Sequence, residues 1–214
     1  MPQTRLWFSP GACSLAPHIL LHEVGLPFET VKTSIPDGGH LTDAFTRLNP
    51  KNRVPVLELD GATITELPAI ATAIAQMAPE RHLMGRTNLE KVRAYEWMNW
   101  LSGTVHGQGF GGLWRPNRFS DDQATHEAIR EKARKTIADC FDTIERKDFG
   151  EWSVGDGFTA VDAFLLVFYR WGNAIGMGMA ESYPRYASFA EILLRRPSVM
   201  SAIATEGISP SGQR

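Results

Sequence analysis

Residues 53–65, Arg-Val-Pro-Val-Leu-Glu-Leu-Asp-Gly-Ala-Thr-Ile-Thr, contain two strand-like runs separated by a turn. The runs at 53–59 and 63–65 are rich in the β-branched and apolar residues typical of strands. Asp60-Gly61 between them is a strong signal for a tight hairpin turn. Pro55 stands at the head of the first run, where a strand tolerates proline because the position need not donate a ladder hydrogen bond. The stretch therefore predicts a β-hairpin.

The residues before this hairpin alternate between strand and helix signals. Residues 5–8 and 29–34 have strand-like content, and apolar residues at helical spacing predict a helix over 14–24 between them. A strand, a helix and a second strand in this order imply a parallel sheet with a right-handed crossover. Two further helical segments are predicted on either side of the hairpin, at 42–48 and 66–77.

The combined order is β-α-β-α-β-β-α, with a cysteine at the first helix and a proline opening the third strand. That arrangement is the one found in the thioredoxin-like fold. Only about 5–6% of X-Pro bonds in folded proteins are cis, but this arrangement leads us to expect a cis Val54-Pro55 bond.

Everything after the first eighty residues is helical in pattern. Thr159 and Asp162 form a capping-box signal that opens a nearly all-apolar run, 163–171, and such a helix belongs in the middle of a bundle. We expect an α/β thioredoxin-like N-terminal domain followed by an all-α helical bundle C-terminal domain. Other helices are predicted at 88–106, 121–146, 183–195 and 197–205. The expected divisions are a first domain at 1–79, a linker at 80–88, a helical domain at 89–208 and a flexible tail at 209–214.

The composition gives no reason to expect nucleic acid or an anionic membrane as a partner, because the formal net charge of the 214 residues is −2. No apolar stretch is long enough for a membrane span or a signal peptide, so we expect a cytoplasmic protein. Cys13 and Cys140 lie far apart, which argues against a disulfide framework or a zinc site. His18 and His22 are four residues apart but lack a further ligand pattern, so we expect solvated or interface histidines and no metal.

Cys13 lies at the junction between the first predicted strand and the first predicted helix. Cys13 or Ser14 would occupy the N-cap region, where unpaired backbone N–H groups and the helix dipole favour an anion. Such a position can lower a cysteine pKa from about 8.5 to ~3.5–7.5. The alternative is that Cys13 is a small buried apolar residue, because free cysteine is among the most buried residue types.

Five separated segments resemble motifs of the cytosolic glutathione transferase family, and they are most similar to its bacterial beta class. They are Ser-Pro-Gly-Ala-Cys-Ser-Leu-Ala-Pro-His at 9–18, Asn-Pro-Lys-Asn-Arg-Val-Pro-Val-Leu at 49–57, Thr-Glu-Leu-Pro-Ala-Ile at 65–70, Glu-Trp-Met-Asn at 96–99 with His106, and Phe-Thr-Ala-Val-Asp-Ala at 158–163. The segments occur in the family's order and cover nearly the whole chain.

The resemblance implies a homodimeric detoxification enzyme that binds glutathione as a co-substrate and adds it to a small apolar electrophile, or exchanges it with a disulfide. The resemblance implies that Cys13, Ser14 and His106 are catalytic. The implied glutathione-binding residues are Ala12, Asn52, Arg53, Val54, Pro55, Glu66, Leu67 and Asn99. Asn99 and His106 are seven residues apart, which is two α-helical turns, so both can face one cleft.

Three positions depart from the family pattern. Gly107 replaces the lysine that usually follows the histidine, so a cation near the sulfur or a glutathione carboxylate is missing. Leu67 replaces a serine or glycine, and Asn52 replaces a glycine before the Val-Pro pair. Two alternatives therefore stay open: a glutathione-dependent oxidoreductase or lyase that uses Cys13 covalently, and a non-catalytic protein that binds a ligand or partner.

Residues 107–112, Gly-Gln-Gly-Phe-Gly-Gly, match the G-x-G-x-x-G pattern of dinucleotide-binding loops. That fingerprint requires a strand before it and a helix after it, and here a long helix precedes it, so we reject a nucleotide site. We expect the glycines to break the helix and to line the floor of the cleft. The predicted site for the second substrate consists of Phe110, Trp114, Arg170 and Trp171.

Overall fold

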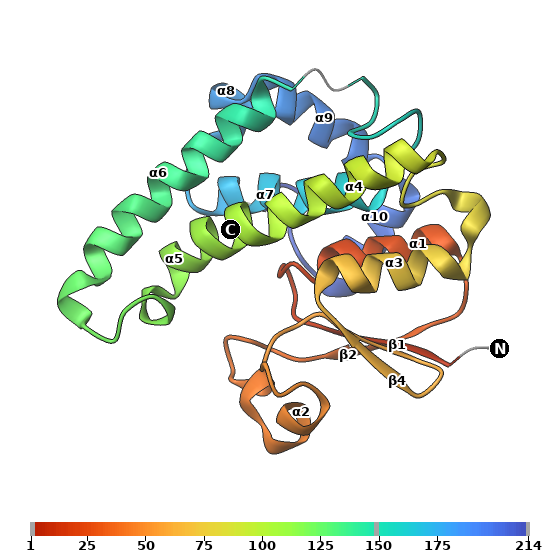
Figure 1. Ribbon diagram of the computed structural model, residues 1–214, viewed down its shortest axis with the longest axis horizontal. Helices are drawn as coiled ribbons and strands as arrows, with labels where there is room; N and C mark the ends of the chain where they lie inside the picture. The colour runs from red at the N-terminus through yellow and green to blue at the C-terminus, as the bar shows by residue number, and fades with distance from the viewer. Residues whose placement is uncertain (1–2, 148–149, 213–214) are drawn as a thin grey trace.

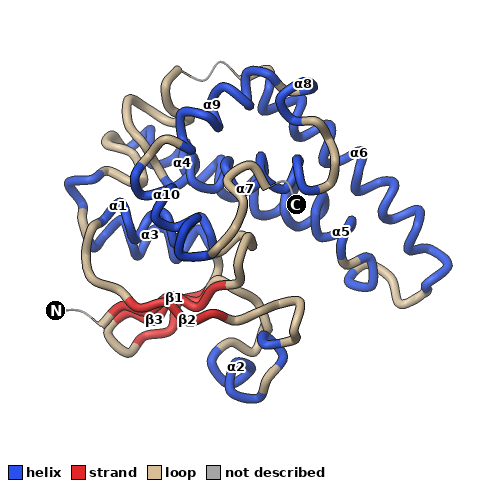
Figure 2. The backbone as a smooth tube through the Cα atoms, turned by 180° about the vertical axis from the view of Figure 1, so that it is seen from behind, coloured by secondary structure: helices blue, strands red, loops and turns tan. Residues whose placement is uncertain are grey.

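The computed structural model describes residues 3–147 and 150–212. A four-stranded sheet has the order β2-β1-β3-β4, in which β1 and β2 are parallel and the other neighbours are antiparallel. Helices α1 and α3 cover one face of the sheet, and α2 lies on its other side (Figures 1 and 2). The elements are β1 Thr4–Phe8, α1 Leu15–Val24, β2 Glu29–Lys32, α2 Asp43–Leu48, β3 Val56–Leu59, β4 Ala62–Thr65 and α3 Leu67–Met77. The predicted thioredoxin-like topology is confirmed.

The expected hairpin is present, with Leu59 paired to Ala62 next to a turn in which Asp60 and Gly61 have positive φ angles. The Val54-Pro55 peptide bond is cis, as expected. Because Pro55 precedes the first residue of β3, it takes no place in the ladder of hydrogen bonds.

The rest of the chain forms helices that pack above the sheet domain. They are α4 Asn88–Trp100, a π-helix Leu101–Phe110, α5 Gly111–Trp114, α6 His126–Glu145, α7 Ala160–Ala174, α8 Met179–Ser182, α9 Pro184–Leu194 and α10 Pro197–Glu206. Short 3-10 turns lie at Gly39–Leu41, Pro79–Arg81, Pro116–Arg118 and Gln123–Thr125. The last of these turns explains why α6 begins at His126 and not at the predicted residue 121. The all-helical C-terminal architecture is confirmed.

Helix α7 lies at the centre of the bundle, as its composition predicts. All its residues from Ala160 to Gly172 are buried. Its start is fixed by the predicted capping box, in which the Asp162 carboxylate accepts hydrogen bonds from the Thr159 backbone N–H and hydroxyl at 2.6 and 2.9 Å. Helix α1 packs on both α7 and α10, so one continuous core joins the sheet domain to the helices.

The glycines of residues 107–112 do not break the helix, which corrects our expectation. The chain continues from α4 through the π-helix into α5. A Cβ atom at Gly109 would stand 2.9 Å from Ile137 Cγ1, and one at Gly112 would stand 3.0 Å from Ala133 Cβ, both on α6. These two glycines therefore permit close packing of two helices.

The segment after α10 runs back along α7. Arg170 donates hydrogen bonds to the carbonyl oxygens of Ser209 and Pro210, and Asn173 donates one to the carbonyl of Ser211. These bonds fasten the first part of the segment predicted as a flexible tail; residues 213–214 lie outside the described residues. Within the described ranges, no helix is both long and apolar enough to cross a membrane.

Candidate active site in the interdomain cleft

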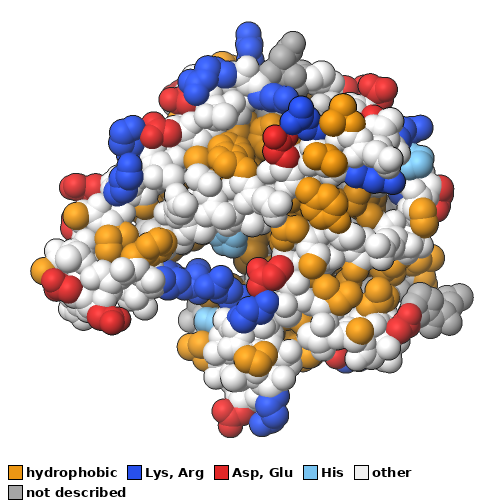
Figure 3. All heavy atoms as spheres, in the orientation of Figure 1, with side chains coloured by type: hydrophobic (Ala, Val, Ile, Leu, Met, Phe, Trp, Pro, Cys, Tyr) orange, Lys and Arg blue, Asp and Glu red, His pale blue; other side chains and the backbone are white. Residues whose placement is uncertain are grey.

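A cavity of about 630 Å³ lies between the sheet domain and the helices. Figure 3 shows this face hollowed between the arm formed by α5 and α6 and the region of α2, with Lys and Arg side chains gathered across the hollow. The cavity brings together eleven predicted site residues: Ala12, Cys13, Asn52, Arg53, Val54, Pro55, Glu66, Leu67, His106, Trp114 and Trp171. Segments that are far apart in sequence thus form one site.

Four predicted site residues lie outside this lining: Ser14, Asn99, Phe110 and Arg170. Ser14 is fully buried, and its hydroxyl donates to the Ser9 carbonyl and accepts from the Ser9 N–H, so it braces the loop before α1. Phe110 is buried behind the residues that line the cavity, with its ring 5.9 Å from that of Phe168. The Arg170 guanidinium is held by the backbone of the segment after α10.

Asn99 is exposed on α4 and does not share the cleft with His106. The expectation assumed that the seven residues between them make two α-helical turns. The chain from Leu101 onward is a π-helix, whose i to i+5 hydrogen bonds place more residues in each turn. The wider turn rotates His106 away from the face that carries Asn99.

The Cys13 side chain is only 7% exposed and lies at the start of α1. Its thiol donates a hydrogen bond to the Val54 carbonyl oxygen, with 3.6 Å between sulfur and oxygen. Burial raises the pKa of Cys13 to about 12, although the backbone N–H groups of Cys13 and Ser14 and the charge of Arg115 act in the opposite direction. Of the two interpretations of Cys13, the lowered pKa is therefore wrong and the buried side chain is what the structure has, because desolvation outweighs the helix terminus.

The loop that carries Cys13 is held from both sides at Gly11. The Gly11 N–H donates to Glu206 Oε2 at 2.8 Å, and Trp171 Nε1 donates to the Gly11 carbonyl at 2.8 Å. Gly11 has a φ of +72°, which favours glycine. Glu206 also contacts His18 Nδ1 at 3.0 Å, and both side chains are fully buried. We expected a solvated or interface histidine; His18 is not solvated and lies at the contact between α1 and α10.

His106 lies on the helical side of the cleft, with its ring 5.2 Å from that of Trp171 and 6.2 Å from that of Phe168. Burial, together with the charges of Arg115, Arg53 and Arg118, lowers the pKa of His106 to about 4. The imidazole is therefore neutral at pH 7. A neutral imidazole can donate one hydrogen bond and accept another, so it can bind a substrate or a water molecule.

Glu66 is the N-cap residue of α3, with a φ of +70°. Its carboxylate forms an ion pair with Lys51, whose Nζ also donates to Thr65 Oγ1 at 2.7 Å. Leu67 is buried at the first position of the helix, where backbone N–H groups are unpaired and favour an anion. A carboxylate and an anion-binding helix end thus lie side by side, which suits an amino acid head group.

The cleft contains cations although Gly107 supplies none. Arg115 and Arg118 follow α5 and line the cleft together with Arg53. Sequence reasoning missed both, since a single arginine in a loop carries no signal of its own. Other lining residues that it missed are Ser9, Pro10, Gly11, Ile35, Pro36, His40, Asn49, Ser102 and Phe119, whereas Gly107 and Gly111 line the cleft as expected.

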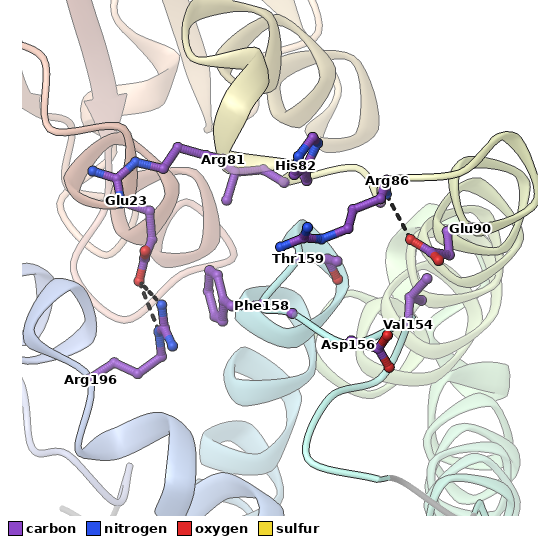
Figure 4. Close-up of a pocket in the computed structure, with 13 residues that line it drawn as sticks. Glu23, Arg81, His82, Arg86, Glu90, Val154, Asp156, Phe158, Thr159 and Arg196 are labelled. Carbon is purple, nitrogen blue, oxygen red and sulfur yellow. Dashed lines mark hydrogen bonds and ion pairs between the residues drawn. The ribbon is translucent and has the colours of Figure 1, made fainter.

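A second cavity, of about 150 Å³, lies where the linker meets both domains. Figure 4 shows Glu23 and Arg196 pointing toward one another there, with Arg81 near Glu23 and with Arg86 on the other side of the pocket, joined to Glu90. The Glu23 carboxylate accepts hydrogen bonds from Arg196 and Ser198. This cavity contains none of the predicted site residues, so the larger cleft is the candidate active site. The described residues include no group of three or more His, Cys, Asp or Glu side chains arranged to hold a metal ion.

Comparisons with known proteins agree with this geometry. The family model "Glutathione S-transferase, N-terminal domain" matches residues 11–77. Glutathione S-transferase GstA of Escherichia coli O157:H7 is 33% identical over 211 residues, which cover 95% of this chain and 99% of that protein. Glutathione S-transferase GST-4.5 of Xanthomonas campestris is 29% identical, with 96% and 100% covered.

Two solved structures share the fold over nearly their full length. A glutathione transferase homolog from sulfitobacter, with bound glutathione, has a TM-score of 0.90 and 27% identity, covering 98% of this chain and 100% of that one. A bacterial beta class glutathione S-transferase of Sphingomonas chungbukensis has a TM-score of 0.83 and 32% identity, covering 96% and 100%.

Proposed function

The chain belongs to the glutathione S-transferase family, and on that premise we propose that it is a transferase that binds glutathione in the interdomain cleft and adds it to an apolar electrophile. The observation that carries the proposal is the convergence of three distant segments on one wall: Cys13 at the start of α1, the cis Val54-Pro55 bond, and Glu66 at the start of α3.

This wall matches the groups of glutathione in order. The γ-glutamyl ammonium binds the Glu66 carboxylate, and the adjacent carboxylate binds the Leu67 N–H at the positive end of α3. The cysteinyl part binds the Val54 backbone, which places its sulfur beside Cys13, because Cys13 Sγ already contacts the Val54 carbonyl. The glycyl carboxylate extends toward Arg53 on the same domain.

The reaction requires glutathione as a thiolate. Since the pKa of Cys13 is raised to about 12, its thiol keeps its proton. When the cysteinyl part of glutathione occupies the Val54 backbone, the single S–H turns from the Val54 carbonyl and donates to the glutathione sulfur instead. Arg115 and the backbone N–H groups at the start of α1 add positive potential. Cys13 therefore stabilises the nucleophile and is not itself the nucleophile, which disfavours covalent thiol–disulfide exchange at this residue.

We further propose that the protein is a cytoplasmic homodimer with a role in detoxification. Its proposed divisions are a sheet domain at 1–79, a linker at 80–88 and a helical domain at 89–208. Leu89 and Val92 on α4 are 65% and 60% exposed, and this apolar face supports pairing with a second copy. Both cysteines are free, which suits a reducing compartment. Light scattering after gel filtration should give twice the chain mass, and Leu89→Glu should reduce it to one chain; a wild-type monomer would contradict the proposal.

Retention on immobilised glutathione and turnover of chlorodinitrobenzene test the proposed activity. We expect the wild type to be retained and active, and Glu66→Gln to lose both properties. Arg134→Gln, an exposed change on α6, is the control and should behave as the wild type. A wild type that is neither retained nor active would contradict the proposed function and favour a non-catalytic role.

A further inference from the structure

Three arginine side chains in the cleft lack an acidic partner. Arg53, Arg115 and Arg118 all line the cavity. Among the described residues, no carboxylate lies within ion-pair distance of any of these three guanidinium groups. The single carboxylate of the described lining, that of Glu66, is paired with Lys51. The cleft therefore has an excess of positive charge.

The three cations are close enough to oppose one another. Partial desolvation lowers the pKa of Arg118, and the charges of Arg115 and Arg53 lower it further. The same three arginines lower the pKa of His106. Gathering like charges at a cavity is unfavourable unless an anion offsets them, because desolvated charges are costly when unpaired.

Two polar atoms of the lining are also buried without a hydrogen-bond partner in the described part of the chain. They are Nδ1 of His40 and the hydroxyl of Ser102. Both can donate hydrogen bonds, and buried polar groups are normally satisfied. These atoms come from opposite walls of the cleft, since His40 belongs to the sheet domain and Ser102 to the π-helix. The lining therefore contains polar groups that the described part of the chain leaves unpaired.

Glutathione does not account for all three arginines. In the proposed orientation its two carboxylates use the start of α3 and Arg53, which lie on the sheet domain. Arg115 and Arg118 lie on the helical side, in and beside the short turn Pro116–Arg118. The neighbouring Trp114 and Phe119 are 43% and 52% exposed, which leaves two aromatic surfaces open to the cleft.

We propose that the second substrate is an anionic aromatic electrophile, whose carboxylate binds Arg115 and Arg118 while its ring packs on Trp114 and Phe119. This inference rests on the proposed transferase function and replaces its general apolar electrophile with an aromatic electrophile that carries a carboxylate. In the reaction, the glutathione thiol gives its proton to solvent, its sulfur forms a bond to the electrophilic carbon, and a halide leaves with the electrons of the broken bond. The guanidinium groups of Arg115 and Arg118 suit the binding of the substrate carboxylate, because guanidinium binds carboxylates through two parallel hydrogen bonds.

The test compares a carboxylate with its neutral analogue, chlorodinitrobenzoate with chlorodinitrobenzamide, each corrected for its uncatalysed rate. We expect kcat/KM for the carboxylate to be higher by about tenfold or more, since hydrogen bonds between charged groups are strong. Arg115→Gln with Arg118→Gln should abolish this preference, and the double lysine variant should keep most of it. Equal rates for the two electrophiles, or an unchanged preference in the glutamine variant, would overturn the inference.

Arg134→Gln on α6 is the matched control and should keep the full preference. The KM for glutathione should change little in the glutamine variant; a rise in that KM with an unchanged electrophile KM would assign the two arginines to glutathione and overturn the inference. If the wild type neither binds glutathione nor turns over either electrophile, the proposed function fails. Equilibrium dialysis of unreactive dinitrobenzoate against dinitrobenzamide then still decides whether the anion site exists.

Discussion

Cys13 shows how a single residue can occupy the expected place and have different chemistry. The sequence places it at a helix start, where the dipole favours a thiolate. The structure adds a feature that composition cannot show: the side chain is buried and donates to the Val54 carbonyl. Desolvation of the thiolate outweighs the dipole, so the thiol keeps its proton.

Alkylation of Cys13 by iodoacetamide should therefore be slow at pH 7. Because the pKa is raised to about 12, the thiolate fraction should rise about tenfold for each pH unit between 7 and 10 without a plateau. Mass spectrometry of the peptide that contains Cys13 measures this rate, and a free cysteine-containing peptide is the control. A plateau of the Cys13 rate near pH 7 would indicate a lowered pKa and contradict the account.

His106 should make the folded state sensitive to mild acid. Its pKa is about 4 when folded and near 6.5 when unfolded, so between these values the unfolded chain binds more protons. Its contribution to the free energy of unfolding is present above pH 6.5 and is lost as the pH falls toward 4. The cause is burial beside Arg115, Arg53 and Arg118, with Glu66 acting in the opposite direction.

Urea titrations of the wild type and of His106→Asn at several pH values test this sign. We expect the wild type to lose more stability than the variant between pH 6.5 and 4. His22 and His40, whose pKa values are also lowered, are present in both proteins and cancel in the comparison. Parallel pH curves for the two proteins would refute the assignment to His106.

Glu206 is the residue that ties α10 to the loop of Cys13. Replacing it with alanine leaves the Gly11 N–H and His18 Nδ1 without their partner in a buried place. We expect Glu206→Ala to lower the free energy of unfolding by on the order of 3 kcal/mol and to weaken glutathione binding. Glu191→Ala, an exposed change on α9, should alter neither quantity. An unchanged free energy of unfolding in Glu206→Ala would contradict the role of Glu206 in holding this loop.

At the scale of elements, the π-helix Leu101–Phe110 could not be predicted from the sequence. Apolar spacing predicted a helix that the glycines would end, and the glycines instead allow α6 to approach closely. A π-helix has no simple sequence signature, and its wider turn separates Asn99 from His106. The hairpin at 53–65 and the capping box at Thr159 were predictable, because each depends on residues that are near one another in sequence.

Alanine substitutions along this segment test the packing role of the glycines. Gly109→Ala places a Cβ 2.9 Å from Ile137 Cγ1, so we expect a loss of about 1–3 kcal/mol in the free energy of unfolding. Gly103→Ala lies in the same π-helix with nothing within 4 Å, and it should be neutral or stabilising by about 0.5–1 kcal/mol. Equal effects of the two changes would show that helix propensity, and not contact with α6, decides this segment.

At the scale of the whole molecule, the site exists because the two domains share one core. Helix α1 packs on α7 and α10, and Trp171 on α7 holds the Gly11 carbonyl beside Cys13. The wall formed by Val54, Pro55 and Glu66 was predictable, since it follows from the fold of the first domain. Arg115, Arg118 and Glu206 were not, because they reach the site only through the packing of the second domain.

Calorimetric titration of glutathione into the wild type and into Glu66→Gln tests the central claim, that the interdomain cleft is a glutathione site. We expect one site per chain in the wild type and an affinity lower by about tenfold or more in the variant, since a charged hydrogen bond to the γ-glutamyl ammonium is lost. No binding heat in the wild type, or equal affinity in Glu66→Gln, would contradict the claim.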